Sequence, residues 1–271
     1  MRDTFYKRPS KHDLEKKEES FDAFVDQIEH EASATELTEQ AQQERLDYIA
    51  AAETDAEEER RWVETYFPTI FSLAWNDAHL YVSRAREGHH TVSGFRKSGK
   101  TAYTMVAKII RPLVEGAGGM HAVNLRTQDK AENRCQMLFR MIDRNRIISH
   151  DYDIDVEQQL KSHYIINGTH LIAGSMRVGL RSLVDEDFNR LKVAVNDDLY
   201  DRTTVSSELD NSRVVEFVTS EVYGQMEDDG LVITLGNSIT DDCPIVRLRE
   251  ENPENHFSLP ALNANGESTW P

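Results

Sequence analysis

The segment that most restricts how this chain can fold is residues 94–101, which read Gly-Phe-Arg-Lys-Ser-Gly-Lys-Thr. They fit the pattern G-x-x-x-x-G-K-[ST] at every fixed position, and this pattern forms a loop whose backbone N–H groups surround phosphate oxygens. Residues 91–93 favour the short strand that must precede such a loop, and residues 102–111 favour a helix after it that Pro112 ends. We therefore expect a phosphate-binding P-loop made of Gly94, Phe95, Arg96, Lys97, Ser98, Gly99, Lys100 and Thr101.

Two side chains at the end of this loop have separate expected tasks. Lys100 would reach the β and γ phosphates of a nucleoside triphosphate, and the Thr101 hydroxyl would be a ligand of Mg²⁺. The helix that begins there adds its positive N-terminal end. ATP with Mg²⁺ is therefore the expected ligand, and a glycine-rich turn without a ligand is the alternative.

Such a site also needs an acidic group that holds Mg²⁺ and orders the attacking water. Residues 192–196 favour an apolar strand, and Asp197 and Asp198 follow it directly. Because side chains alternate along a strand, Asp197 would point to Mg²⁺ and Asp198 to the water. A plain turn is the alternative. The acidic clusters at 185–187 and 227–229 lack an apolar strand before them, so we expect solvated loops there.

A second apolar strand, at residues 231–235, also ends in polar residues. In many ATPases with a P-loop, a polar side chain at the tip of the strand beside the loop contacts the γ-phosphate. Asn237 is the candidate for that role, and a plain strand-to-loop turn is the alternative.

The order of elements along the chain indicates the fold class. Further strands are expected at 120–125 and on both sides of Asn167-Gly168, which favours a hairpin, and further helices at 129–146 and 211–222. Strands that alternate with helices predict an α/β fold with a mainly parallel sheet flanked by helices. Together with the loop at 94–101, this pattern predicts a P-loop NTPase fold of the RecA-like class.

The charge of the chain is concentrated near its N-terminus. Residues 1–64 hold 9 Lys or Arg and 19 Asp or Glu, so they account for −10 of the net charge of −17. Residues 11–64 contain no Gly or Pro, which predicts an acidic helical extension over residues 1–65, partly flexible, before a domain at 66–262. The extension is either a solvated helix pair or a docking segment. The remainder is acidic too, so strong nonspecific binding to nucleic acid by this chain alone is not indicated.

The composition argues against three other kinds of protein. No apolar stretch is long enough to cross a membrane, and the polar N-terminus does not resemble a secretory signal. Cys135 and Cys243 are far apart and have no ligand spacing, which argues against zinc and favours a reducing compartment.

Three motifs in a fixed order resemble the large terminase subunit of tailed bacteriophages. They are the P-loop with Arg96, the segment 189–198 with Gly179-Leu180-Arg181 before it, and the turn at Gly236-Asn237-Ser238. The resemblance covers about residues 70–271 and includes 257–262 and 266–271, which are similar to the stretch that joins the family's ATPase to its nuclease. It implies an ATPase that drives double-stranded DNA into a procapsid.

The resemblance also implies site residues and partners. Arg177 or Arg181 would reach the ATP of a neighbouring subunit, Arg96 would contact the γ-phosphate of its own subunit, and Asn76 would contact adenine. The implied partners are the portal protein, the small terminase subunit and further copies of this chain in a ring. The implied location is the cytoplasm of the infected host, transiently at the portal and not in the mature virion. Residues 263–271 would begin a linker to a nuclease that this chain lacks, so nuclease activity is not expected.

Three other functions remain open. One is a different DNA translocase or helicase-like ATPase. Another is a small-molecule kinase, in which Arg140, Arg144 and Arg146 would belong to a lid. The third is a structural subunit that binds nucleotide and turns over slowly.

Overall fold

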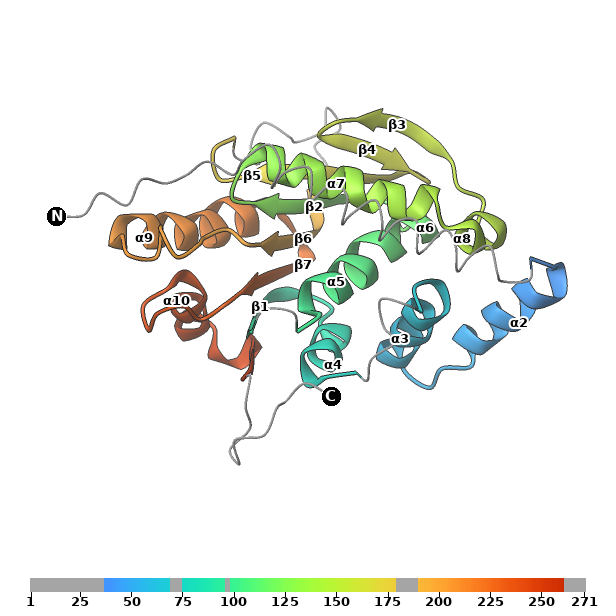
Figure 1. Cartoon of the computed structure of the whole chain (residues 1–271), viewed down its shortest axis with the longest axis horizontal. Helices are drawn as coiled ribbons and strands as arrows, with labels where there is room; N and C mark the ends of the chain where they lie inside the picture. Colours follow the sequence, from blue (N-terminus) through green and yellow to red (C-terminus); the bar gives the residue numbers. More distant parts are fainter. Residues whose placement is uncertain (1–36, 69–74, 96–97, 179–189, 261–271) are drawn as a thin grey trace, which may run out of the picture.

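The computed structural model describes residues 37–68, 75–95, 98–178 and 190–260. Within these ranges the strands form one eight-stranded sheet in the order β3-β4-β5-β2-β6-β7-β1-β8 (Figure 1). The strands are β1 (Gly88–Gly94), β2 (Met120–Leu125), β3 (Val156–Leu160), β4 (His163–Ile166), β5 (Thr169–Ser175), β6 (Leu191–Asp197), β7 (Met226–Gly236) and β8 (His256–Leu259). The pairs β3–β4 and β4–β5 are antiparallel, and the other neighbours are parallel.

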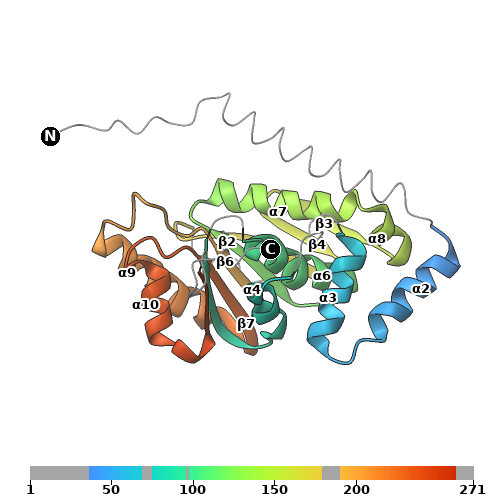
Figure 2. The ribbon, with the colours of Figure 1, turned by 60° about the horizontal axis from the view of Figure 1, so that its bottom comes forward.

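Helices cover both faces of this sheet (Figures 1 and 2). On one face Val195 of β6 packs in a core with the P-loop helix and α7, and on the other face Ala194 packs in a core with α9 and α10. The helices are α2 (Glu39–Ala50), α3 (Asp55–Tyr66), α4 (Asp77–Arg84), α5 (Lys100–Met105), α6 (Arg111–Glu115), α7 (Gln128–Asp143), α8 (Arg146–Asp151), α9 (Glu208–Glu216) and α10 (Pro244–Glu251).

The mainly parallel α/β sheet confirms the predicted fold class. The P-loop strand β1 and the acidic strand β6 are separated by one strand, β7, which carries Asn237 directly after its end. Because parallel strands end at the same edge of a sheet, the P-loop, Asp197 and Asn237 all lie at one carboxyl edge. The fold therefore brings the three predicted motifs to one place.

The predicted hairpin is also confirmed. Ile166 pairs with Thr169, so Asn167 and Gly168 form a two-residue turn, and their φ values of 49° and 70° suit that turn. Two strands escaped prediction because both are short and partly polar: β3, and β8 in the stretch that resembled a linker. The cluster 227–229, expected as a solvated loop, instead lies within β7.

The helix after the P-loop does not end at Pro112. It runs through a π-helical turn, η1 (Val106–Ile110), into α6 and ends before Gly116, whose φ is 64°. Proline in a regular helix clashes with the carbonyl four residues earlier, and a wider turn relieves this clash. The predicted helix at 129–146 is α7, which ends at Asp143. A separate helix, α8, begins at Arg146 because Asn145 caps it by accepting hydrogen bonds from the N–H groups of Ile147 and Ile148.

The predicted boundary between residues 65 and 66 falls inside α3. Trp62, Val63 and Tyr66 of this helix are buried in the same core as the P-loop helix. Ile49 of α2 lies in this core too, so α2 and α3 both pack on the described sheet domain. Residues 1–36 lie outside the described residues.

Three short helical turns complete the described structure. The turns η2 (Phe217–Val222) and η3 (Tyr223–Gln225) follow α9, and η4 (Pro253–Asn255) lies between α10 and β8.

In the described part of the chain, no helix has both the length and the apolar character needed to cross a membrane.

Candidate nucleotide site

The P-loop connects the end of β1 to the start of α5. Gly99 lies just before the helix with φ of 75°, a conformation that glycine adopts without a steric penalty. A side chain at Gly94 would lie 3.4 Å from the Leu259 Cβ, so the loop also leaves the sheet at a point of close packing. Arg96 and Lys97 lie outside the described residues.

Lys100 points back into the loop. Its Nζ donates to Asn237 Oδ1 at 3.1 Å and to the carbonyl oxygens of Gly94 and Phe95 at 3.4 Å. Burial lowers the pKa of Lys100, while the charges of Asp197 and Asp198 act to raise it. The ammonium group thus lies among oxygen acceptors at the position where the motif would place phosphate oxygens.

The hydroxyl of Thr101 and the carboxylate of Asp197 lie together. Thr101 Oγ1 donates to Asp197 Oδ1 at 3.2 Å, and the guanidinium of Arg134 lies 3.3 Å from Asp197 Oδ2. Burial raises the pKa of Asp197, and Arg134 opposes that effect. Hard oxygen ligands of this kind fit Mg²⁺, which proteins often bind through one or two side chains together with substrate phosphates. The residues therefore fit the predicted ion.

Arg134 is a site residue that the sequence did not reveal. It lies on α7, and the pattern along that helix does not distinguish it from Arg140. Its place beside Asp197 arises from the packing of α7 near the end of β6.

Asp198 leaves the strand at a sharp turn. β6 ends at Asp197, and Asp198 has φ of 47° and is exposed. The carboxylates of Asp197 and Asp198 were expected to point in different directions because side chains alternate along a strand, but Asp198 lies beyond the strand. The left-handed backbone separates the two carboxylates, and it directs Asp198 to a cavity of about 170 Å³ shared with Lys130, Tyr200 and Asn237.

Asn237 follows β7 and is held from two sides. Its Oδ1 accepts from Lys100, and its backbone oxygen accepts from the Tyr200 hydroxyl at 2.9 Å. A Cβ at Gly236 would lie 2.6 Å from that hydroxyl, so glycine is needed for the close approach of Tyr200. Tyr200 is a second residue whose role the sequence did not indicate.

No protein-family model matches this chain, and no curated protein matches it. The chain is similar in structure to the ATPase domain of a large terminase. That domain comes from Thermus phage P74-26 and is 13% identical, with a TM-score of 0.43 over 63% of this chain and 67% of that chain. An arginine-to-alanine mutant of the same domain gives 12% identity and the same TM-score, over 63% and 68% of the two chains.

Asn76 does not lie open to a ligand. Its Oδ1 accepts from the N–H groups of Ala78 and His79 and caps α4, and its Nδ2 donates to the Ser98 carbonyl at 2.9 Å. The side chain is 6% exposed. Both of its polar atoms are thus engaged within the chain, and Asn76 supports the P-loop from behind. The expected contact with adenine would require Asn76 to give up one of these hydrogen bonds, and it stays a prediction.

Of the two arginines that were expected to act on a neighbouring subunit, the structure describes one, Arg177. Arg177 is exposed just beyond the end of β5, and three strands (β2, β6 and β7) separate β5 from β1. At about 4.8 Å per strand, β5 lies roughly 19 Å from β1, so Arg177 does not join this site. Its role in a neighbouring site stays a prediction. Arg181 lies outside the described residues.

Proposed function

We propose that this chain hydrolyses ATP with Mg²⁺ as the motor domain of a DNA-packaging terminase. The observation that carries the ATPase part is the meeting of Lys100–Asn237 at 3.1 Å and Thr101–Asp197 at 3.2 Å on one carboxyl edge. These pairs join a phosphate-binding loop to a carboxylate that suits a divalent cation and to a polar strand tip.

The chemical step is the attack of water on the γ-phosphorus. Asp198 accepts a hydrogen bond from the water and orients it. The water oxygen then forms a bond to the γ-phosphorus, and the bond between that phosphorus and the β–γ bridging oxygen breaks. The bridging oxygen keeps the electron pair, ADP and inorganic phosphate leave, and one water proton is released. Lys100 neutralises charge on the β and γ oxygens. Bound Mg²⁺ would supply further charge neutralisation on the same oxygens, held by Thr101 and Asp197.

The packaging part of the proposal is supported by the order of the sequence motifs that resemble a large terminase. Its partners would be double-stranded DNA, the portal protein, the small terminase subunit and further copies of this chain in a ring. The work would take place in the host cytoplasm, at the procapsid portal. An activity that DNA stimulates with no portal present would favour the translocase alternative instead.

The test compares the purified chain with Lys100→Ala and Asp198→Asn. Asparagine also tolerates the left-handed backbone of Asp198, so the second variant removes charge with little strain. We expect phosphate release to fall by about 100-fold or more in each. Lys161→Ala is the matched control, because this exposed lysine pairs with Glu132 away from the P-loop.

Two further measurements separate the alternatives. EDTA should stop turnover, and added Mg²⁺ should restore it. Radiolabelled γ-phosphate should appear as free phosphate; transfer to a small acceptor would identify a kinase. Wild-type rates in a Lys100→Ala chain would refute the proposed mechanism.

A further inference from the structure

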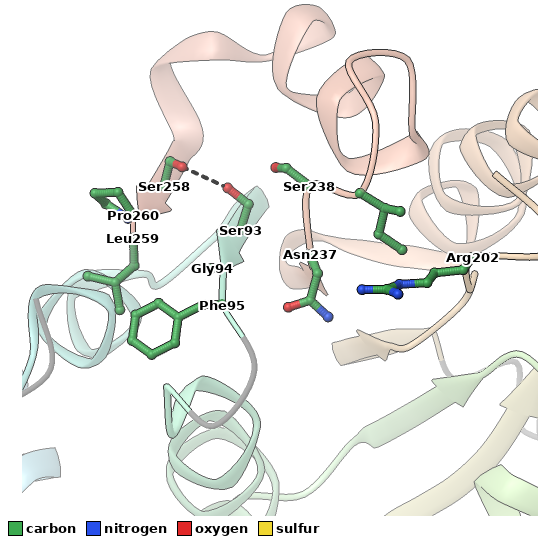
Figure 3. A pocket seen from close by; sticks show the side chains of 10 residues that line it. Ser93, Gly94, Phe95, Arg202, Asn237, Ser238, Ser258, Leu259 and Pro260 are labelled. Carbon is green, nitrogen blue, oxygen red and sulfur yellow. Dashed lines mark hydrogen bonds between the residues drawn. The ribbon is translucent and has the colours of Figure 1, made fainter. Parts of the chain in front are cut away.

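A cavity of about 460 Å³ opens at the carboxyl ends of β1, β7 and β8 (Figure 3). Phe95, Leu259 and Pro260 line one side, and Asn237 and Arg202 line the other. Asn237 is also the residue that binds the Lys100 ammonium. Through Asn237 and the first residues of the P-loop, the cavity therefore adjoins the place where the motif would hold phosphates.

The guanidinium of Arg202 is directed toward Asn237 across this cavity (Figure 3). Arg202 is exposed, and within the described ranges no ion pair or hydrogen bond holds its side chain. Two other arginines at this edge are already paired, Arg126 with Asp201 and Arg134 with Asp197. The charge of Arg202 is thus available to a ligand.

The backbone that carries Arg202 is held firmly. In the turn that follows β6, Asp201 N–H donates to Thr204 Oγ1 at 2.9 Å, Thr203 N–H donates to Asp201 Oδ1 at 2.9 Å, and Val205 N–H donates to the Asp201 carbonyl at 3.1 Å. Just before the turn, the hydroxyl of buried Tyr200 donates to the Asn237 backbone. The turn is therefore fixed to the tip of β7, and ordering Arg202 on a ligand costs little beyond its own side-chain entropy.

The chemistry at this edge calls for a second cation. The γ-phosphoryl group spreads negative charge over its three non-bridging oxygens during transfer, and stabilising that charge is the main task of the protein. Lys100 is a single ammonium that approaches from the P-loop side. A guanidinium can donate two parallel hydrogen bonds to phosphate oxygens, and Arg202 would do so from the opposite side.

We infer that Arg202 is a catalytic residue that contacts the transferring γ-phosphoryl group bound by its own chain. This inference rests on the proposed ATPase function. As water bonds to phosphorus and the bridging oxygen departs with ADP, Arg202 donates hydrogen bonds to two non-bridging oxygens and keeps its own protons. It is distinct from Arg96, Arg177 and Arg181, to which the sequence resemblance directs attention.

The test uses the full chain with Arg202→Ala and Arg202→Lys, and Arg213→Ala as the control. Arg213 lies on α9 with its side chain 60% exposed and pairs with Asp210. We measure kcat and KM for ATP, and the affinities for ADP and for ADP with aluminium fluoride in Mg²⁺, a mimic of the transferring phosphoryl group.

For Arg202→Ala we expect kcat to fall by about 100-fold, the affinity for the aluminium fluoride complex to fall by about the same factor, and ADP affinity to stay within about threefold of wild type. Arg202→Lys should recover part of the loss. If Arg202→Ala keeps its kcat within threefold, or loses ADP affinity as strongly as affinity for the mimic, the inference is overturned. A wild-type chain that never hydrolyses ATP would instead refute the proposed function.

Mixing variants tests whether Arg202 acts within one chain. In a mixture of Arg202→Ala and Lys100→Ala, every chain lacks one of the two cations of its own site. Action within one chain predicts that the mixture has no more activity than the separate variants together. Recovery of activity on mixing would place the Arg202 contact in a neighbour's site and overturn the inference.

Discussion

The buried ion pair between α3 and the π-helical turn gives the sharpest test of where the folded domain begins. Glu59 Oε2 lies 2.5 Å from Lys108 Nζ, and the side chains are 7% and 6% exposed. Glu59 Oε1 also accepts from the Tyr103 hydroxyl at 2.6 Å, and Lys108 donates to the Ala85 carbonyl at 3.2 Å. The pair thus connects a helix of the supposed extension to the helix that follows the P-loop.

Removing one partner should be costly because the other charge stays buried. For Lys108→Met we expect a loss of about 3–5 kcal/mol in the free energy of unfolding. The loss should fall toward the lower end, since Arg86 lies 3.6 Å from Glu59 Oε2 and keeps some compensation. Glu59→Gln leaves Lys108 unpaired and should cost a similar amount. The double variant removes both charges and keeps an acceptor for Tyr103, so we expect it to lose only about 1 kcal/mol.

Urea denaturation followed by tryptophan fluorescence measures these losses, and buried Trp62 reports on α3 itself. A double-mutant cycle then gives the coupling between the two side chains. Glu57→Gln, on the same helix, removes only the charge of a partly exposed pair with Arg61 four residues later, so it should cost much less than Lys108→Met. A loss below about 1 kcal/mol for Lys108→Met, with an unaltered slope against urea, would refute the packing of α3 on the P-loop helix.

Three further predictions concern single positions. Gly236→Ala should displace Tyr200 from Asn237 and cost about 1–3 kcal/mol, with slower ATP turnover, as thermal melting and phosphate release would measure; unchanged turnover would contradict it. Asn76→Ala should remove the α4 cap and the hydrogen bond to Ser98, which lowers the free energy of unfolding by about 0.5–2 kcal/mol and weakens nucleotide binding in a calorimetric titration. Asp77→Ala keeps that hydrogen bond and serves as the control. Burial lowers the pKa of His121 to about 4. Between pH 6.5 and 4 the unfolded chain therefore binds a proton that the folded chain does not, and the free energy of unfolding, unaffected by His121 above pH 6.5, falls by roughly 1.4 kcal/mol per pH unit as the pH is lowered. His121→Leu should have a flatter pH dependence in urea melts.

Local patterns predicted the parts of the fold that local chemistry determines. The P-loop motif, the hairpin at Asn167 and the apolar strands each depend on neighbours in sequence. The structure contains the hairpin, the strands, and β1 and α5 on the two sides of the P-loop motif. The role of α3 was hidden because Glu59 is one of five consecutive charged residues, and only its buried partner, Lys108, distinguishes it. Arg134, Tyr200 and Arg202 reach the site through packing and turns, which no spacing in the sequence records.

Asn196 is a polar residue in the mainly apolar strand β6, and its hydrogen bonds connect neighbouring strands of the sheet. It interrupts the apolar run of β6 one residue before Asp197, yet it is fully buried. Its Oδ1 accepts from Asn124 at 2.8 Å, its Nδ2 donates to Thr234 Oγ1 at 3.0 Å, and that hydroxyl lies 3.1 Å from His89 Nε2. A row of polar contacts therefore crosses from β2 through β6 and β7 to β1. Side chains alternate along a strand, so this row fixes the face of the sheet opposite to Asp197. It holds the acidic strand, the Asn237 strand and the P-loop strand in one register, as a site assembled from three strand ends requires.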